Sequence, residues 1–83
     1  MSSENSLLAD EILDLKGVAS PFNYVRAKLK LETMEIGKTL EVILDDGAPI
    51  NNVPRSLKQD GHSILLEEKI NLQNWKILVK KEI

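Results

Sequence analysis

The spacing of apolar residues changes along this chain, and that change limits the folds the chain can adopt. In segment 39–45 apolar and polar residues alternate, as Leu40, Val42 and Leu44 show, which is typical of a strand with one buried face. In segments 20–34 and 50–57 apolar residues recur every three or four positions, which indicates helices. Two further strands are predicted near the C-terminus, over 62–70 and 74–82.

The first helix has clear signals at both ends. We expect it to begin at Ser20-Pro21, because Ser is a favoured N-cap and Pro suits the first helical position. It is expected to run to about Met34, with Gly37 closing it. A short strand over 12–15 precedes this helix.

The second half of the chain predicts a turn, a short helix and a hairpin. Residues 46–49 are expected to form a turn, and Pro54 is placed near the first turn of the short helix. Only residues 71–73 connect the last two strands, so these should pair antiparallel. The predicted order is β-α-β-α-β-β. We therefore expect an α+β fold, a two-layer sandwich with a four-stranded mixed sheet and both helices on one face.

The length of the chain and its net charge limit the number of domains and the kinds of partner that it can bind. With 83 residues the chain predicts one domain, which we place at 10–83, after a flexible N-terminal tail over 1–9. The net charge of −2 disfavours general binding to nucleic acid or to a membrane surface. No apolar run approaches the length of a membrane span, and the first ten residues do not resemble a signal peptide. We therefore expect a cytoplasmic protein without membrane contact.

The chain contains no cysteine and one histidine, His62. Disulfides, cysteine-ligated zinc, iron–sulfur clusters and persulfides are therefore excluded as groups held by this chain's own thiols. A single histidine also disfavours a histidine-based metal site. We expect no metal and no cofactor, and we interpret Asp45-Asp46 as turn residues rather than as an acid–base pair.

The first helix carries more apolar surface than a two-layer fold needs. One stripe consists of Tyr24, Ala27, Leu31 and Met34, and a second lies roughly opposite, at Phe22, Val25 and Leu29. The second stripe predicts a partner-binding surface, with a homodimer contact or coverage by the N-terminal tail as alternatives. Four basic residues lie on or just before this helix: Lys16, Arg26, Lys28 and Lys30. They either form a solvated face or steer an acidic protein or RNA toward it.

The stretch from Leu13 to Pro21 resembles the TusA/SirA-like family of small sulfur-carrier proteins, which typically reads Leu-Asp-x-x-Gly-x-x-Cys-Pro-x-Pro there. The resemblance covers about residues 12–82. It continues through Gly37, Thr39-Leu40, Asp45-Asp46, Val53-Pro54 and Gly61-His62.

The resemblance implies the same β-α-β-α-β-β sandwich and a function in sulfur transfer. In that family the cysteine carries a persulfide, accepted from a cysteine desulfurase or a related sulfurtransferase and passed to partner proteins. Some members act toward thiolation of the tRNA wobble uridine, so tRNA would be involved only indirectly. The position of that cysteine at a helix start favours the thiolate.

Two positions depart from the family pattern: Ser20 stands in place of the cysteine, and Asn23 in place of the second proline. A serine hydroxyl forms no stable persulfide equivalent, and a helix terminus cannot ionise it near neutral pH. Ser20 is open to three interpretations: a helix N-cap, a replacement of a native cysteine, or a nucleophile activated by His62. The last needs a base within hydrogen-bond reach.

The function hypothesis is a TusA/SirA-like domain that works by protein–protein contact around Ser20-Pro21, as a monomer or weak dimer. The partner-binding residues would be Lys16, Phe22, Val25, Arg26 and Leu29. With a cysteine at position 20 the domain would be a sulfur carrier, and with serine a regulatory or scaffolding module, so enzymatic activity is left open. RNA binding is a weaker alternative. The chain has one Trp, one Tyr and one Phe, too few to form a surface on which successive bases could stack.

Overall fold

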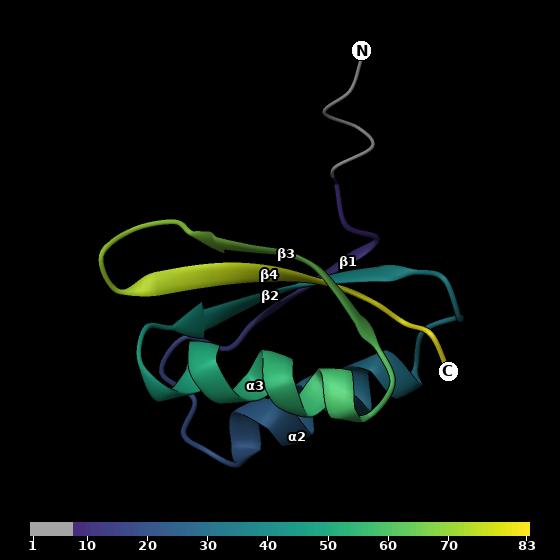
Figure 1. Ribbon diagram of the computed structural model, residues 1–83, viewed down its shortest axis with the longest axis horizontal. Helices are drawn as coiled ribbons and strands as arrows, with labels where there is room; N and C mark the ends of the chain where they lie inside the picture. Colours follow the sequence, from purple (N-terminus) through teal and green to yellow (C-terminus); the bar gives the residue numbers. More distant parts are fainter. Residues whose placement is uncertain (1–7) are drawn as a thin grey trace.

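Four strands form one sheet, and both helices cover the same face of it (Figure 1). The computed structural model describes residues 8–83. Its elements are β1 (Glu11–Asp14), α2 (Phe22–Glu32), β2 (Thr39–Asp45), α3 (Ala48–Gln59), β3 (Ser63–Lys69) and β4 (Asn74–Lys80). The predicted order β-α-β-α-β-β and the α+β two-layer class are confirmed.

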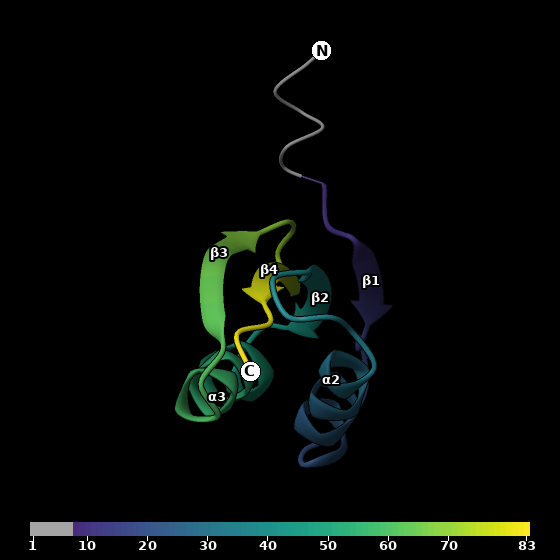
Figure 2. The same cartoon turned by 90° about the vertical axis from the view of Figure 1, so that its right-hand side faces the viewer.

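The sheet has the strand order β1-β2-β4-β3 and is mixed. β1 pairs parallel with β2, whereas β4 pairs antiparallel with both β2 and β3. The parallel pair needs a crossover connection, which α2 provides. Figure 2 shows α2 beneath the β1 and β2 side of the sheet and α3 beneath the β3 side. Because β1 and β2 run parallel and each is followed by a helix, both helices start from the same end of the domain.

The core lies between the sheet and the helices. β2 alternates as predicted, with Leu40, Val42 and Leu44 fully buried toward the helices. Val42 lies opposite Ile77 of β4, and Leu40 lies opposite Val79. The helices complete the core with Ala27, Leu31, Val53 and Leu57, all at most 1% exposed. Each fully buried aliphatic side chain of this size stabilises the fold by roughly 1.5–3 kcal/mol.

The start of α2 differs from the prediction that Ser20 is its N-cap. α2 begins at Phe22, Pro21 occupies the cap position, and the cap makes no side-chain hydrogen bond. Instead, backbone carbonyls accept the first amide hydrogens: the N–H of Asn23 donates to Ala19 O at 3.1 Å. The helix also ends at Glu32, earlier than the expected Met34.

The start of α3 also corrects the prediction. Residues 46–49 were expected to be a turn, but α3 already begins at Ala48, after Gly47 with φ of 93°. Pro49 lies in the first turn, where its missing N–H costs nothing. Pro54 therefore lies inside the helix, where it removes a hydrogen bond at a cost of about 3 kcal/mol. Burial of Ile50, Val53 and Leu57 outweighs that cost.

Asp10 is hydrogen-bonded to the first residue of β2. Its backbone N–H donates to Thr39 O at 3.1 Å, and its Oδ2 accepts from Thr39 N at 2.8 Å. That backbone hydrogen bond from Thr39 lowers the pKa of Asp10. Of the predicted tail over 1–9, residues 1–7 lie outside the part that the structure describes. Among residues 8–83, no helix is long and apolar enough to span a bilayer.

Candidate functional site

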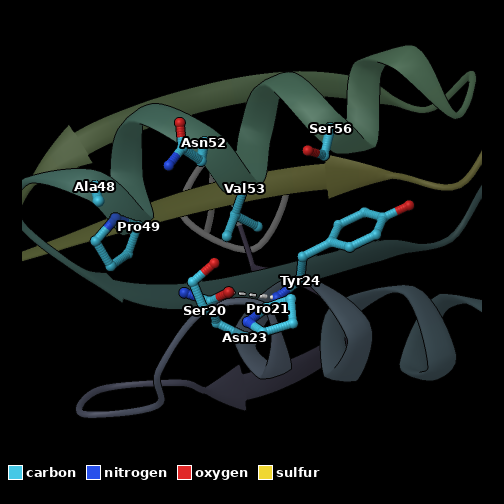
Figure 3. A pocket seen from close by; sticks show the side chains of 9 residues that line it. All are labelled: Ser20, Pro21, Asn23, Tyr24, Ala48, Pro49, Asn52, Val53 and Ser56. Carbon is cyan, nitrogen blue, oxygen red and sulfur yellow. Dashed lines mark hydrogen bonds between the residues drawn. The ribbon is translucent and has the colours of Figure 1, made fainter.

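A cleft opens between the first turns of α2 and α3, next to the loop that carries Ser20 (Figure 3). It is lined by Ser20, Pro21, Asn23, Tyr24, Ala48, Pro49, Asn52, Val53 and Ser56. Its volume is about 140 Å³. Since drug-sized ligand pockets measure about 300–1,000 Å³, the cleft suits a small group rather than a nucleotide.

Ser20 is exposed at this cleft, immediately before α2. The Ser20-Pro21 peptide bond is cis, and the carbonyl of Pro21 accepts from Val25 N at 3.0 Å. The predicted site residues Ser20 and Pro21 therefore lie together, at the end of the domain from which both helices start. Ser20 is exposed to solvent, so a partner protein can reach its side chain.

Asn23 is a cleft residue that sequence reasoning missed. Its side chain is 2% exposed, and it is the one buried polar residue among the described ones. Its Oδ1 accepts from the backbone N–H of Tyr24 at 2.7 Å, so it satisfies one amide hydrogen in the first turn of α2. An Asn in the first turn of a helix was the available signal, because its short side chain reaches free amide hydrogens there.

Tyr24 forms the inner wall of the cleft and links the two helices. Its hydroxyl donates to Oδ2 of Asp60, which lies at the C-terminal end of α3. This hydrogen bond to Asp60, together with burial, raises the pKa of Tyr24 above its ordinary value. The ring packs against the core, as the predicted stripe of Tyr24, Ala27, Leu31 and Met34 requires.

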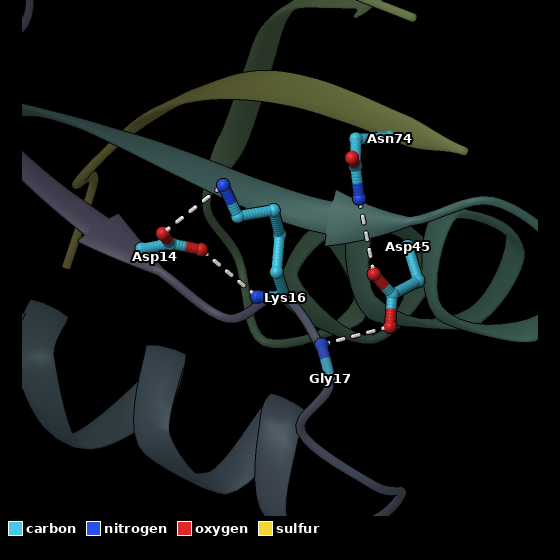
Figure 4. Close-up of polar contacts among 5 residues, drawn as sticks. All are labelled: Asp14, Lys16, Gly17, Asp45 and Asn74. Atoms are coloured by element: carbon cyan, nitrogen blue, oxygen red, sulfur yellow. Dashed lines mark hydrogen bonds and ion pairs between the residues drawn. The ribbon is translucent and has the colours of Figure 1, made fainter. Parts of the chain in front are cut away.

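The loop before Ser20 is anchored to the sheet by Asp45 (Figure 4). Oδ2 of Asp45 accepts from Gly17 N at 2.9 Å, and its Oδ1 accepts from Asn74 Nδ2 at 3.1 Å. Gly17 has φ of 76°, which favours glycine at this turn. Asp14 is a local contact, since it accepts from Lys16 N at 2.9 Å. Asp45 was interpreted as a turn residue; it is instead the last residue of β2, and its carboxylate holds the loop through its bonds to Gly17 and Asn74.

The second apolar stripe of α2 is exposed to solvent. Phe22 is 63% exposed, Val25 40% and Leu29 55%, whereas Ala27 and Leu31 on the opposite side are buried. The stripe begins two residues after Ser20 and runs along the outer face of α2. Its assignment to partner binding stays a prediction.

Lys16 and the basic residues of α2 are mostly paired within the chain. Lys16 pairs with Asp14 at 3.5 Å and Lys28 with Glu32 at 3.8 Å, and Lys30 pairs with Glu11 of β1. Among the described residues, Arg26 makes no ion pair. Arg26 is exposed on α2 next to the apolar stripe, so it is the basic group there that is left for an acidic partner.

Ser20 and His62 lie at opposite ends of α3. Ser20 shares the cleft with the first turn of α3, whereas His62 follows its last turn and accepts a hydrogen bond from Glu82 N at 3.2 Å. A helix of 12 residues is about 18 Å long. His62 is therefore far outside hydrogen-bond reach of Ser20, and the interpretation of Ser20 as a His-activated nucleophile is wrong.

The carboxylates at the end of β2 serve separate structural contacts. Asp46 accepts from Trp75 Nε1 at 2.7 Å and pairs with Lys69 at 3.2 Å. The hydrogen bond from Trp75, with that from Lys69, lowers the pKa of Asp46. Within residues 8–83, no three His, Cys, Asp or Glu side chains are grouped in a way that could hold a metal ion.

A family model described as sulfurtransferase TusA matches residues 11–81 of this chain. The chain belongs to the TusA family. A protein of Archaeoglobus fulgidus that is provisionally named a sulfur carrier is 45% identical over 74 residues, which cover 89% of this chain and 84% of that protein. The sulfur carrier protein TusA of Allochromatium vinosum is 33% identical over 72 residues, which cover 87% of this chain and 93% of that protein.

The fold of this TusA-family chain also matches a solved structure. A Helicobacter pylori protein, known from its solution structure, superimposes with a TM-score of 0.66 and covers 87% of this chain and 97% of its own. The two sequences are 19% identical, so this likeness concerns the fold alone. The resemblance predicted from the sequence is thus confirmed for the family and for the sandwich fold.

Proposed function

We propose that this TusA-family domain binds protein partners of a sulfur-transfer system around Ser20 and does not itself carry sulfur. The observation that carries the proposal is the exposed Ser20 at the helix start, where the family pattern has its cysteine. A carrier needs a thiolate there, which attacks the outer sulfur of a donor persulfide and releases the donor's thiolate. A hydroxyl has too high a pKa to ionise and forms no stable sulfur adduct.

The docking surface we propose joins the mouth of the cleft to the outer face of α2. Phe22, Val25 and Leu29 supply apolar area that a partner would remove from water, at roughly 25 cal/mol per Å². Arg26 supplies a positive charge for an acidic residue of the partner. Lys16 precedes Ser20 in the sequence and would contribute less, because it pairs with Asp14.

The first test places a cysteine thiol at position 20. Ser20→Cys should accept sulfur from a cysteine desulfurase supplied with ³⁵S-cysteine, and the protein should carry a label that a reducing agent removes. The unchanged chain should carry none. A persulfide needs only the thiol at this position and the fold that presents it to the donor.

Ser20→Ala is the control for this test, and it should behave as the unchanged chain does. Label on the unchanged chain would contradict the proposal that serine prevents transfer. A Ser20→Cys protein that folds but acquires no label would contradict the proposal that the scaffold still receives sulfur-transfer partners.

The second test addresses the docking surface. In the Ser20→Cys background, Phe22→Asp/Val25→Asp should slow labelling by at least tenfold, because two charges would be placed in the apolar contact. Arg26→Glu should slow labelling several-fold and reduce its dependence on salt. The initial rate of label uptake measures both effects.

Leu72→Asp is the matched control, since Leu72 is 86% exposed in the β3–β4 turn, away from α2. It should label at the parent rate. Equal rates for the α2 variants and this control would remove the stripe from the interface.

A further inference from the structure

Within the part of the chain that the structure describes, the side-chain amide nitrogen of Asn23 has no hydrogen-bond partner. Its Oδ1 is engaged by Tyr24 N, but among residues 8–83 no hydrogen bond uses its Nδ2. Every fully buried side-chain nitrogen or oxygen in that part of the chain has a partner. Nδ2 therefore retains some contact with solvent, and the side chain lines the cleft beside Ser20 (Figure 3). Two N–H donors are thus held ready in a residue that is otherwise 98% buried.

The electrostatics of the cleft favour an anion over a cation. None of its nine lining residues carries a charge, so no carboxylate opposes a negative group. α2 and α3 both begin at this cleft, and the start of a helix is its positive end (Figure 3). The hydroxyl proton of Tyr24 is donated to Asp60, so Tyr24 does not serve as a donor to an anion in the cleft.

The size of the cleft limits the anion to the end of a side chain. About 140 Å³ accommodates a group of a few heavy atoms, such as a carboxylate, a thiolate or a persulfide end. The walls formed by Pro21, Pro49 and Val53 are apolar, which suits a weakly hydrated group.

We propose that the cleft binds a small anionic group, a carboxylate or a sulfur anion presented by a partner protein, with Nδ2 of Asn23 as its donor. The binding follows from the geometry of the cleft, whereas its assignment to a partner side chain rests on the proposed function. An anion bound in the cleft lies next to Ser20. The cleft would therefore select which side chain the docked partner places beside that residue.

The test is a titration of the ¹⁵N-labelled 83-residue chain with sodium acetate and, separately, sodium thiosulfate. HEPES, a large buffer anion, keeps the ionic strength constant. The side-chain NH₂ signals of Asn23 should shift and saturate with at least one of the two anions. The backbone amides of Ser20 and Ala48 should shift with the same apparent affinity. Tighter binding of acetate identifies a carboxylate as the natural group, and tighter binding of thiosulfate identifies a sulfur anion.

Asn23→Asp replaces the donor by a carboxylate, and Asn23→Leu removes it without adding charge. Both should weaken binding at least tenfold, read from the amides of Ser20 and Ala48, with the fold checked by circular dichroism. Asn71→Asp adds the same charge in the exposed β3–β4 turn and should bind as the unchanged chain does. Shifts that rise without saturation, or equal affinities in both Asn23 variants, would overturn the inference. Label transfer to Ser20→Cys would then still support the proposed function, so the two can fail separately.

Discussion

Tyr24 shows at the scale of one residue how the cleft keeps its shape. Its ring packs on the core while its hydroxyl reaches Asp60 at the far end of α3. One side chain therefore couples both helices that line the cleft. Because the chain has one tyrosine, its ionisation can be followed without interference from another.

The alkaline titration of Tyr24, followed by absorbance near 295 nm, should have a midpoint above the ordinary value of 10.0. The hydrogen bond to Asp60 favours the neutral phenol, so the folded pKa exceeds the unfolded one. The resulting stabilisation is complete below the ordinary pKa and is lost as the pH rises through the folded pKa. Asp60→Asn should lower the midpoint toward 10.0 and flatten the loss of urea resistance at alkaline pH. An unchanged midpoint in Asp60→Asn would show that Asp60 is not the cause.

At the scale of elements, the position of Ser20 depends on the connection between β1 and α2. The backbone N–H of Leu15 donates to Ile43 O at 3.0 Å, which continues the β1–β2 ladder into the loop. Asp45 then holds Gly17 and also bonds Asn74 of β4. The loop that presents the cleft is thus fastened to two strands.

Asp45→Ala should raise amide hydrogen exchange at residues 17–20 while leaving the core amides protected. The reason is that two hydrogen bonds to one carboxylate are lost, worth about 1 kcal/mol each or somewhat more. Exchange measured residue by residue by NMR checks this result.

Asp14→Ala is the comparison for Asp45→Ala, because among residues 8–83 the Asp14 carboxylate makes polar contacts with Lys16 alone. It should change exchange at residue 16 and little else. Equal exchange profiles for the two variants would show that Asp45 does not fasten the loop.

At the scale of the whole molecule, stability rests on the layer between the sheet and the two helices. Leu57 of α3 is completely buried there, together with Leu44 of β2 and Ile77 of β4. The opposite face of the sheet contributes less, since β3 is largely exposed and is interrupted by a bulge between Ile64 and Leu66. In such a thin core each buried side chain is a large share of the total stability.

Leu57→Ala should therefore destabilise the domain by about 2–5 kcal/mol, through lost burial and a residual cavity. Leu72→Ala removes the same atoms from a side chain that is 86% exposed and should change stability by less than about 0.5 kcal/mol. Urea unfolding followed by the fluorescence of Trp75, the single tryptophan, gives both values. Similar midpoints for the two variants would contradict the location of the core.

The sequence by itself determined the architecture, because an element with one buried face needs apolar residues at the spacing of that element. Leu40, Val42 and Leu44 alternate since one face of β2 is covered, and the two stripes of α2 separate into a buried and an exposed one for the same reason. The family pattern from Leu13 to Pro21 likewise located the exposed position 20.

Only the tertiary structure decided which polar groups meet. Asp45 and Gly17 are 28 residues apart, and Tyr24 and Asp60 are 36 apart, so no local pattern could pair them. Ser20 does not cap α2, whereas Asn23 accepts from the amide of Tyr24 in the first turn. Lys30, a member of the predicted basic surface, pairs with Glu11 of β1. Hydrogen bonds and ion pairs depend on directions and distances set by packing, whereas a hydrophobic period depends only on which side of an element is covered.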